Sequence, residues 1–195
     1  MNAPLTRREQ LKADRRRQLL TEGARLIADR GFLGVRLEDL GAAVGVSGPA
    51  VYRHFSGKEA LLVELLVGVS ERLLDGGRAV VAAAESPTGA LAGLIEFQLD
   101  FALGEPDLIR IQDQDLANLP AAARRQVRSY QRRYVEVWVD ALRALDPELS
   151  EPDARVRSHA TFGLLNSTPH SANGSPPERV RTILRAMAHA MLTPA

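Results

Sequence analysis

The stretch GVSGPAVYRHF, residues 45–55, decides the fold of this chain. Glycine readily adopts the left-handed backbone conformation that ends many helices, so Gly45 is expected to end one helix. Ser47 is a residue type that caps a helix by accepting a backbone N–H, and Pro49 suits the first turn of the helix that follows. The stretch therefore predicts a helix, a tight turn and a second short helix. This unit places its second helix in the major groove of DNA.

The flanking sequence predicts further helices on both sides of this unit. Upstream, Leu20, Ala24 and Ile27 are spaced like the buried face of one helix. Residues 37–44 predict a short helix with acidic residues at its positive N-terminal end. After Lys58, apolar residues recur with helical spacing and predict a long amphipathic helix. Three short helices followed by a long one suffice for a DNA-binding head.

This order of segments resembles the tetracycline-repressor (TetR) family of bacterial transcription regulators. The resemblance runs from about Arg15 to Leu66 and rests on RLIADRGF, LEDLGAAVGVS, AVYRHF and GKEALL in the family's order and spacing. It implies an all-α fold of about nine helices, with a three-helix helix-turn-helix DNA-binding head followed by a helical ligand-binding and dimerisation body. We expect the head at residues 1–60, including a flexible basic arm at 1–14, and the body at residues 61–195.

The resemblance also assigns residues on or beside the recognition helix to DNA contacts. Tyr52, His54 and Lys58 fall where the family contacts phosphates. Two positions depart from the family pattern: Arg36 stands where a hydroxyl residue often caps the second helix, and Gly48-Pro49 replace a Lys-Gly pair. The first change offers an arginine to the phosphates, and the second should alter which bases are recognised. The predicted DNA-contacting residues are Arg36, Ser47, Gly48, Pro49, Ala50, Tyr52, Arg53, His54 and Lys58.

The charge distribution agrees with a polyanionic partner at one end of the chain. Residues 1–58 contain 11 Lys and Arg against 6 Asp and Glu, whereas the remaining residues contain 14 against 18, which gives net charges of +5 and −4. The basic residues before and within the first helix form either a solvated tail or an arm that adds non-specific attraction to phosphates. They are Arg7, Arg8, Lys12, Arg15, Arg16 and Arg17.

Several classes of protein are disfavoured by what the 195 residues lack. There is no cysteine, and no run approaches the roughly 18–20 apolar residues that a membrane-spanning helix needs. We therefore expect a cytoplasmic protein that makes no contact with a membrane. The resemblance implies that it is bacterial and associated with the nucleoid when it binds DNA.

An enzyme is also disfavoured, and we expect neither a catalytic nor a metal site. The segment from Gly45 begins like a GxSxG nucleophile elbow, but Pro49 takes the place of the last glycine. The four histidines lack the HExxH or HxxxH spacing of a helical zinc site. The alternative to a regulator is a helical adaptor that does not bind DNA, and an enzyme is a more remote alternative.

In the body, prolines and glycines divide the sequence into helices. The last two of these mix small and apolar residues, which either pack within one chain or form a surface for association. The resemblance implies a dimer of four helices, two from each subunit, and a dimer is what recognition of a palindromic operator requires. Helices are predicted after Ser86-Pro87 and at residues 108–119, 120–145, about 153–170 and 177–192, and the association residues are Val156, Ala160, Phe162, Gly163, Leu184, Ala186, Ala190 and Met191.

The middle of the body is the predicted site of a small-molecule effector that would release a repressor from DNA. Pro169 either simply ends its helix or kinks it so that nearby polar side chains point into a pocket. The arginines of residues 124–133 form either a solvated face or a surface for an anionic, phosphate-bearing ligand. Since some TetR-like regulators respond to acyl-CoA thioesters, an acyl-CoA is one candidate. The predicted ligand-binding residues are Gln98, Gln112, Tyr130, Tyr134, Trp138, Phe162, Asn166 and His170.

Overall fold

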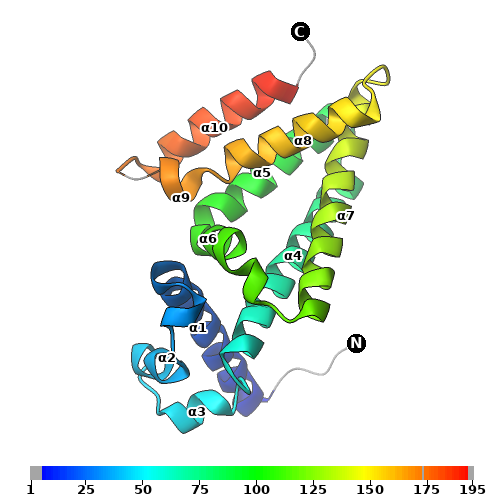
Figure 1. The fold of residues 1–195 in the computed structure, drawn as a ribbon. Coiled ribbons are helices and arrows are strands. Elements are labelled where there is room, and N and C mark those ends of the chain that lie inside the picture. Colours follow the sequence, from blue (N-terminus) through cyan, green and yellow to red (C-terminus); the bar gives the residue numbers. More distant parts are fainter. Residues whose placement is uncertain (1–5, 173, 193–195) are drawn as a thin grey trace.

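The chain folds into two connected groups of helices (Figure 1). The computed structural model describes residues 6–172 and 174–192, and these contain helices but no β-strand, so the all-α prediction is confirmed. One group forms the head, and α4 runs from it into the second group, the body. The helices are α1 (Arg7–Arg30), α2 (Leu37–Ala43), α3 (Gly48–Tyr52), α4 (Lys58–Ala83), α5 (Pro87–Gly104), α6 (Pro106–Asp115), α7 (Ala121–Leu145), α8 (Glu151–Leu165), the single turn α9 (Thr168–Ser171) and α10 (Pro177–Leu192).

The turn between α2 and α3 depends on two glycines. Gly45 has a φ of 70°, the left-handed conformation expected from the sequence. At Gly41, an added Cβ atom would lie 2.8 Å from the carbonyl oxygen of Val46, so only glycine lets the chain fold back this closely. Ser47 occupies the position before α3, but its side chain accepts no hydrogen bond there, so the predicted cap through its hydroxyl is wrong. Pro49 lies in the first turn, as expected.

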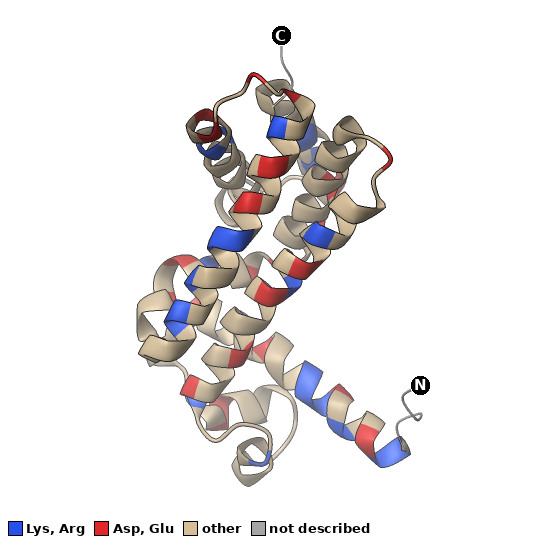
Figure 2. Ribbon diagram, turned by 90° about the vertical axis from the view of Figure 1, so that its right-hand side faces the viewer, with Lys and Arg blue, Asp and Glu red and all other residues tan. Residues whose placement is uncertain are grey.

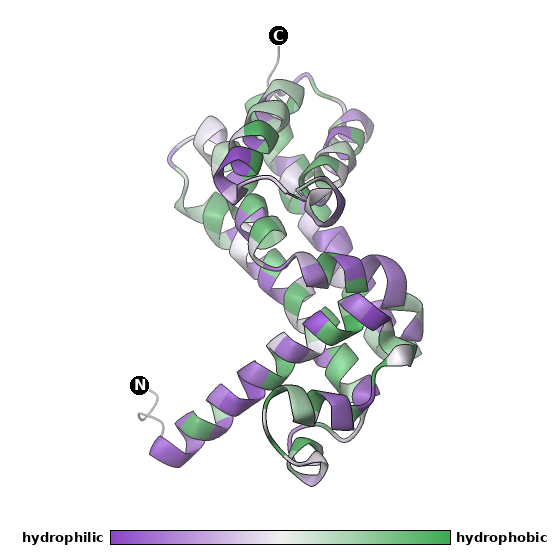
Figure 3. Cartoon of the chain, turned by 90° about the vertical axis from the view of Figure 1, so that its left-hand side faces the viewer, coloured by the Kyte–Doolittle hydropathy of each residue, from purple (hydrophilic) through white to green (hydrophobic). Residues whose placement is uncertain are grey.

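The first helix begins much earlier than the sequence suggested. The backbone N–H of Thr6 donates to Oε2 of Glu9 at 2.8 Å, and the N–H of Glu9 donates back to the Thr6 hydroxyl at 3.3 Å. This capping box starts the helix at Arg7. The prediction of a flexible arm at residues 1–14 is therefore wrong from Arg7 onward, and residues 1–5 lie outside the described part of the chain. Figure 3 shows the first turns of α1 as a hydrophilic helix that projects from the head.

Arg16 fastens α1 to the rest of the head. Its Nε donates to Oε1 of Glu64 in α4 at 2.8 Å, and its Nη2 pairs with the other oxygen of the same carboxylate. Its Nη1 donates to the carbonyl of His54 at 2.6 Å, and the guanidinium lies 4.6 Å from the centre of the Phe55 ring. One side chain thus joins α1, the α3–α4 loop and α4. Arg16 is therefore occupied within the head, contrary to its assignment to a free basic arm.

The head and the body share a continuous apolar interior along α4. The first turns of α4, at Leu61, Leu62 and Leu65, belong to the same buried cluster as the helix-turn-helix, and this cluster extends to Ile109 and Ile111 of α6. The predicted domain boundary at residues 60–61 therefore falls within a helix, and part of the body is packed against the head.

A buried carboxylate marks the contact between head and body. Asp115, at the end of α6, is only 5% exposed. Both of its oxygens lie 3.3 Å from the backbone nitrogen of Phe32, which follows α1, and Oδ1 also accepts from Asn118 at 2.8 Å. Since a buried carboxylate is costly without hydrogen bonds, these donors determine where α6 sits against the head.

Within the body, α4 lies very close to α5 and α7. A Cβ atom added at Gly76 would approach the Phe97 ring to 2.2 Å, and one added at Gly77 would approach the Tyr134 ring to 2.4 Å. Two successive glycines inside a helix are unfavourable for helix stability, by roughly 1 kcal/mol each relative to alanine. Their presence here is explained by the aromatic rings that occupy the space of the missing side chains.

The helix predicted at about residues 153–170 is in fact two helices. Ser150 caps α8 by accepting from the N–H of Asp153 at 3.2 Å, so the helix starts at Glu151, and it ends at Leu165. Pro169 lies in the first turn of the separate helix α9. The Thr168 hydroxyl donates to the carbonyl of Ala102 at 2.6 Å, which holds α9 against α5.

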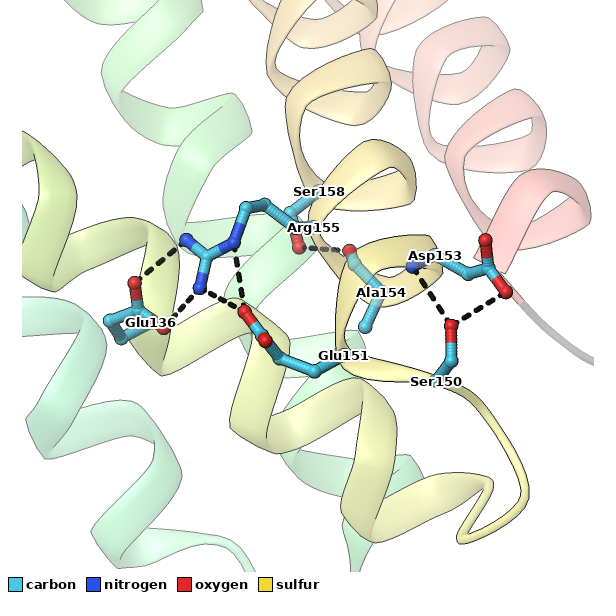
Figure 4. A network of polar contacts seen from close by, with 7 residues as sticks. All are labelled: Glu136, Ser150, Glu151, Asp153, Ala154, Arg155 and Ser158. Atoms are coloured by element: carbon cyan, nitrogen blue, oxygen red, sulfur yellow. Dashed lines mark hydrogen bonds and ion pairs between the residues drawn. The ribbon is translucent and has the colours of Figure 1, made fainter.

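Ion pairs hold α8 against α7, as Figure 4 shows. Nη1 and Nη2 of Arg155 pair with the two oxygens of Glu136 in α7 at 2.7 and 2.9 Å, and its Nε donates to Glu151 at 3.0 Å. The guanidinium lowers the pKa of Glu136 through these hydrogen bonds. The pairing positions α8, which carries residues of the body cavity and of the exposed apolar surface that are both described below. No helix in the described part of the chain is long and apolar enough to cross a membrane.

Candidate nucleic-acid interface and effector cavity

The recognition helix α3 has one buried and one exposed side. Val51 is completely buried and Phe55, just after the helix, is 2% exposed, so these two residues anchor it. The outer side carries polar or flat groups, and Tyr52, which is 51% exposed, donates to Oε1 of Glu38 at 3.4 Å. In Figure 1, α3 and the N-terminal end of α1 lie at the same end of the molecule. Ser47, Pro49, Tyr52 and Arg53 are exposed, and Gly48 and Ala50 are partly buried.

Two exposed arginines at this end have guanidinium groups without partners. Arg36 precedes α2, and its backbone N–H donates to Oδ2 of Asp39 at 3.0 Å, which caps the helix without using the side chain. Arg53 follows α3 directly. Neither guanidinium forms an ion pair or hydrogen bond with the residues that the structure describes, so both are available to phosphates. In Figure 2, further basic positions line the projecting part of α1.

His54 lies among positive charges. Its Nδ1 is buried and has no hydrogen-bond partner among the described residues. Burial lowers the pKa of His54, and the charges of Arg16, Lys12, Arg53 and Arg15 lower it further. In the absence of DNA the imidazole is therefore held in its neutral form near pH 7.

Lys58, which the sequence predicts to contact a phosphate, is hydrogen-bonded within the head. Its ammonium group donates to the carbonyl oxygens of Phe32, Leu33 and Val35 at 3.1, 3.3 and 3.2 Å. It also lies 4.7 Å from the centre of the Phe32 ring. All three N–H bonds of the ammonium are thus used to hold the chain between α1 and α2 against the start of α4. A phosphate contact by Lys58 would require the loss of these hydrogen bonds.

The body contains a partly open cavity of about 230 Å³ between α4, α5, α6, α7 and α8. Five of the eight predicted ligand-binding residues line it: Gln98, Gln112, Tyr134, Phe162 and Asn166. Its other lining residues, which the sequence analysis missed, are Ser70, Leu73, Phe101, Gln131, Val135 and His159. Of these, Ser70 carried a signal in the sequence, since it is a polar residue within the apolar stripe of a long helix.

A chain of hydrogen bonds between uncharged side chains runs along the cavity wall. The Tyr134 hydroxyl donates to Oε1 of Gln98 at 3.0 Å, and Nε2 of Gln98 donates to Oδ1 of Asn166 at 2.8 Å. Gln98 is 1% exposed, and burial raises the pKa of Tyr134, so this phenol remains a neutral donor. Such a wall suits a ligand with a neutral polar group, for example a carbonyl, attached to an apolar part.

Three predicted ligand-binding residues lie outside the cavity. Trp138 is completely buried behind the wall, with its ring centre 5.1 Å from that of Phe162. Tyr130 points elsewhere and donates to Glu71 at 3.1 Å. His170 is exposed on α9, because the break before that helix turns it away. Within residues 6–172 and 174–192, no group of His, Asp or Glu side chains is arranged to hold a metal ion.

A helix-turn-helix head with an exposed recognition helix, joined to a helical body with a cavity, defines a DNA-binding regulator of transcription. Comparison with known proteins identifies the particular family. Residues 19–65 match the family model of the bacterial regulatory proteins of the tetR family, and residues 84–170 match that of the tetracyclin repressor-like C-terminal domain. The chain belongs to the TetR family of transcriptional regulators.

Individual relatives agree with this assignment. The transcriptional repressor KstR2 of Mycobacterium tuberculosis is 30% identical over 148 residues, which cover 73% of this chain and 72% of the relative. KstR2 of Rhodococcus jostii is 26% identical, and the match spans 66% of its length. Among solved structures, KstR2 of M. tuberculosis superposes with a TM-score of 0.78 at 22% identity, covering 93% of this chain and 96% of that one. AibR, solved with isovaleryl coenzyme A and operator DNA, has a TM-score of 0.75 at 20% identity, with 93% and 100% covered.

The different surroundings of Arg53 and Lys58 lead to a first prediction. Arg53→Ala should weaken binding to a DNA duplex of any sequence and reduce the slope of log affinity against log salt by about one, because one phosphate contact is lost. Lys58→Met should leave that slope unchanged and lower the melting temperature instead, because three carbonyls lose their donor. Equal losses of slope in the two variants would show that Lys58 also binds a phosphate.

The position of His54 leads to a second prediction, about pH. A phosphate next to the imidazole would favour its charged form, so the pKa of His54 should be higher in the complex than in the free protein. Binding then takes up a proton, and DNA affinity should fall as the pH rises from about 6 to about 8. Titrations of the parent and of His54→Gln at several pH values measure this. If the variant keeps the same pH dependence, the proton binds elsewhere.

Proposed function

We propose that this protein is a homodimeric repressor that binds a palindromic operator through two heads and leaves it when a small acyl compound enters the body cavity. The observation that carries the proposal is the position of the cavity. It is lined by residues of α4 and α6, the same two helices that complete the apolar core of the head. A change in the cavity therefore acts directly on helices that position the recognition helix.

The proposed DNA contacts come from the exposed end of the head. Arg36 and Arg53 would bind phosphates with free guanidinium groups, and His54 would do so once protonated. Ser47, Gly48, Pro49, Ala50 and Tyr52 would approach base edges or the backbone from α3. The protein would act in the cytoplasm, on DNA of the nucleoid, with a head formed by residues 1–60 and a body formed by residues 61–195.

The proposed effector is a short acyl thioester. At about 230 Å³, the cavity lies below the range of roughly 300–1,000 Å³ that is typical of ligand pockets, which suits a short branched acyl group. The uncharged donors and acceptors of the wall suit a thioester carbonyl. One solved relative, AibR, contains isovaleryl coenzyme A together with operator DNA, and the KstR2 structure is described as that of a ketosteroid transcriptional regulator.

The arginines of α7 would bind the phosphates of a coenzyme A outside the cavity. Arg125, Arg128, Arg132 and Arg133 are exposed and have no ion-pair partner within the described residues. Arg128 precedes the cavity residue Gln131 by three positions, which places the two on neighbouring parts of the same helical face. The acyl group and the phosphates could thus be bound along one side of α7.

The effector would act by favouring a conformation with misplaced heads. A preference of about 2–3 kcal/mol for that conformation is enough to change operator affinity by one to two orders of magnitude. The path is short: Gln112 of α6 donates to Ser70 of α4 at 3.4 Å in the cavity wall, and Asp115 of the same α6 accepts from Phe32 of the head.

The surface proposed for dimerisation lies on α8 and α10. Four of the seven large apolar side chains exposed in the described structure are on these helices: Val156 (68%), Ile183 (49%), Met187 (47%) and Met191 (40%). Small exposed residues lie between them with helical spacing, at Ala160, Gly163, Ala186 and Ala190. Two other residues predicted for this surface, Phe162 and Leu184, belong instead to the cavity wall and the chain's own core.

A third prediction tests the effector with a matched pair of tyrosines. Isovaleryl coenzyme A should raise the melting temperature and weaken the gel shift of the DNA upstream of the chain's own gene. Tyr134→Phe should reduce effector affinity about tenfold, because a buried hydrogen bond in the cavity is lost. Tyr130→Phe, outside the cavity, should have no effect. An effector that stabilises the protein but leaves operator affinity unchanged would contradict the proposed coupling.

A fourth prediction tests the dimer. Met187→Glu would bury an unpaired charge in the proposed interface, which is costly, so the variant should be a folded monomer at micromolar concentration and bind the operator poorly. Ala122→Glu, exposed in the first turn of α7 and outside the proposed surface, should remain dimeric. Analytical ultracentrifugation measures both. A monomeric parent protein, or a dimeric Met187→Glu variant, would contradict the proposal.

A further inference from the structure

A second and larger hollow lies between the head and the body. It has a volume of about 390 Å³ and is bounded by α1, α4 and the turn from α5 to α6. Its floor is apolar: Ala24, Leu65, Val69 and Leu108 are each less than 9% exposed and face it. Neither the DNA-binding surface nor the effector cavity includes any of these four residues. We call this hollow the junction groove.

The junction groove continues into the body. A neighbouring hollow of about 310 Å³ is also bounded by Val69, Arg72 and Glu105, so the two hollows share one wall. Phe97 and Phe101 add aromatic surface to this second part. Both hollows are open to solvent, and both combine apolar side chains with charged ones. This combination suits an amphipathic ligand with an apolar part and one charged group.

An ion pair crosses the groove where its two parts meet. Nη2 of Arg72 in α4 lies 2.8 and 2.7 Å from the two oxygens of Glu105, in the turn between α5 and α6. Both side chains are well exposed, at 61% and 44%, so solvent weakens the pair. Nη1 and Nε of Arg72 form no hydrogen bond with the described residues. The guanidinium therefore retains donors that a second anion could use.

The acidic side chains around the groove are already paired with other residues. Glu64 is bound by Arg16, Asp107 lies 3.9 Å from Arg110, and Asp100 lies 2.7 Å from Arg181. Arg17, the other cation at the rim, is paired only with Asp14 on the exposed face of α1. Since both the acidic groups and Arg17 are paired, the feature of the groove that favours an anion is the set of unused N–H donors on Arg72.

We propose that the junction groove binds an amphipathic carboxylate, with the hydrocarbon chain along the apolar floor and the carboxylate on Arg72. The ligand class follows from the apolar floor of the groove and from the unused donors of Arg72. The apolar floor and Arg72 lie outside the effector cavity, although the second hollow shares Leu73 and Phe101 with that cavity. The proposal stands whether or not the cavity takes an acyl thioester. Because α1 forms one wall, an occupied groove joins the head to the body through the ligand.

Decanoate is a suitable probe, and isothermal titration calorimetry on the full-length protein measures its affinity. Arg72→Gln should weaken binding at least tenfold, because the charged anchor is lost. Glu105→Gln should strengthen binding several-fold, because the ligand carboxylate no longer competes with Glu105 for Arg72. Decanol should bind much more weakly than decanoate. Arg143→Gln, which removes an exposed arginine from the last turn of α7, is the matched control and should change nothing.

Two further measurements locate the bound ligand. Hydrogen exchange should show protection at residues 17–24 and 104–108 with decanoate, and this protection should be absent in Arg72→Gln. Gln98→Leu, in the effector cavity, should leave decanoate binding intact. The proposal is overturned if Gln98→Leu abolishes binding while Arg72→Gln does not, since the ligand would then occupy the effector cavity. Affinity that is equal for decanoate and decanol, or unchanged in both Arg72→Gln and Glu105→Gln, would also overturn it.

Discussion

The burial of one stripe of α4 in two successive apolar cores is the constraint on which the rest of the structure depends. Leu61, Leu62 and Leu66 are completely buried in the core of the head, and Leu74 is buried in that of the body. Because an α-helix is stiff over this length, rotation or tilt of α4 in one core must move side chains in the other. The head and the body therefore cannot move independently. A ligand-responsive regulator requires this mechanical coupling.

The contacts around α4 are of two kinds, and they differ in how readily they can change. The apolar contacts are numerous and non-directional, so small shifts cost little. The polar contacts are few and directional: Arg16 to Glu64, Lys58 to three carbonyls, and Asp115 to the Phe32 amide. These hydrogen bonds define discrete positions for α1, for the turn after it and for α6. They give the head a particular orientation on the body, which an effector can favour or disfavour.

Much of this architecture could be predicted from the sequence, where local chemistry decides the outcome. Gly45, Pro49 and the prolines that begin α5 and α10 act within one helical turn, and the helices lie where these residues predicted. The prediction that α3 is a recognition helix rests on short sequence motifs that occur in a fixed order and spacing. The start of α1 differs from the prediction, because a basic stretch is also typical of a flexible arm, although Thr6 and Glu9 have the spacing of a capping box.

The site was harder to predict, because its members come together only through packing between distant helices. Gln98, Tyr134 and Asn166 line the cavity as predicted and form a chain of hydrogen bonds, whereas Trp138 lies behind the cavity wall. Nothing in the local sequence shows that the ammonium of Lys58 reaches back to the carbonyls of residues 32–35. The break before α9, which turns His170 away from the cavity, is accompanied by a hydrogen bond from Thr168 to Ala102 of the distant helix α5, which the local sequence does not reveal.

The pair Gly76-Gly77 has a consequence for how such a sensor changes during evolution. Tyr134 can stand where it does because α4 has no side chain at Gly77, although neither glycine touches the cavity itself. A single methyl group added there would displace the ring that forms the cavity wall. The dimensions of the binding space are therefore encoded partly in a backbone position outside it. New ligand preferences can arise by substitutions on the far side of an aromatic ring, with every lining residue unchanged.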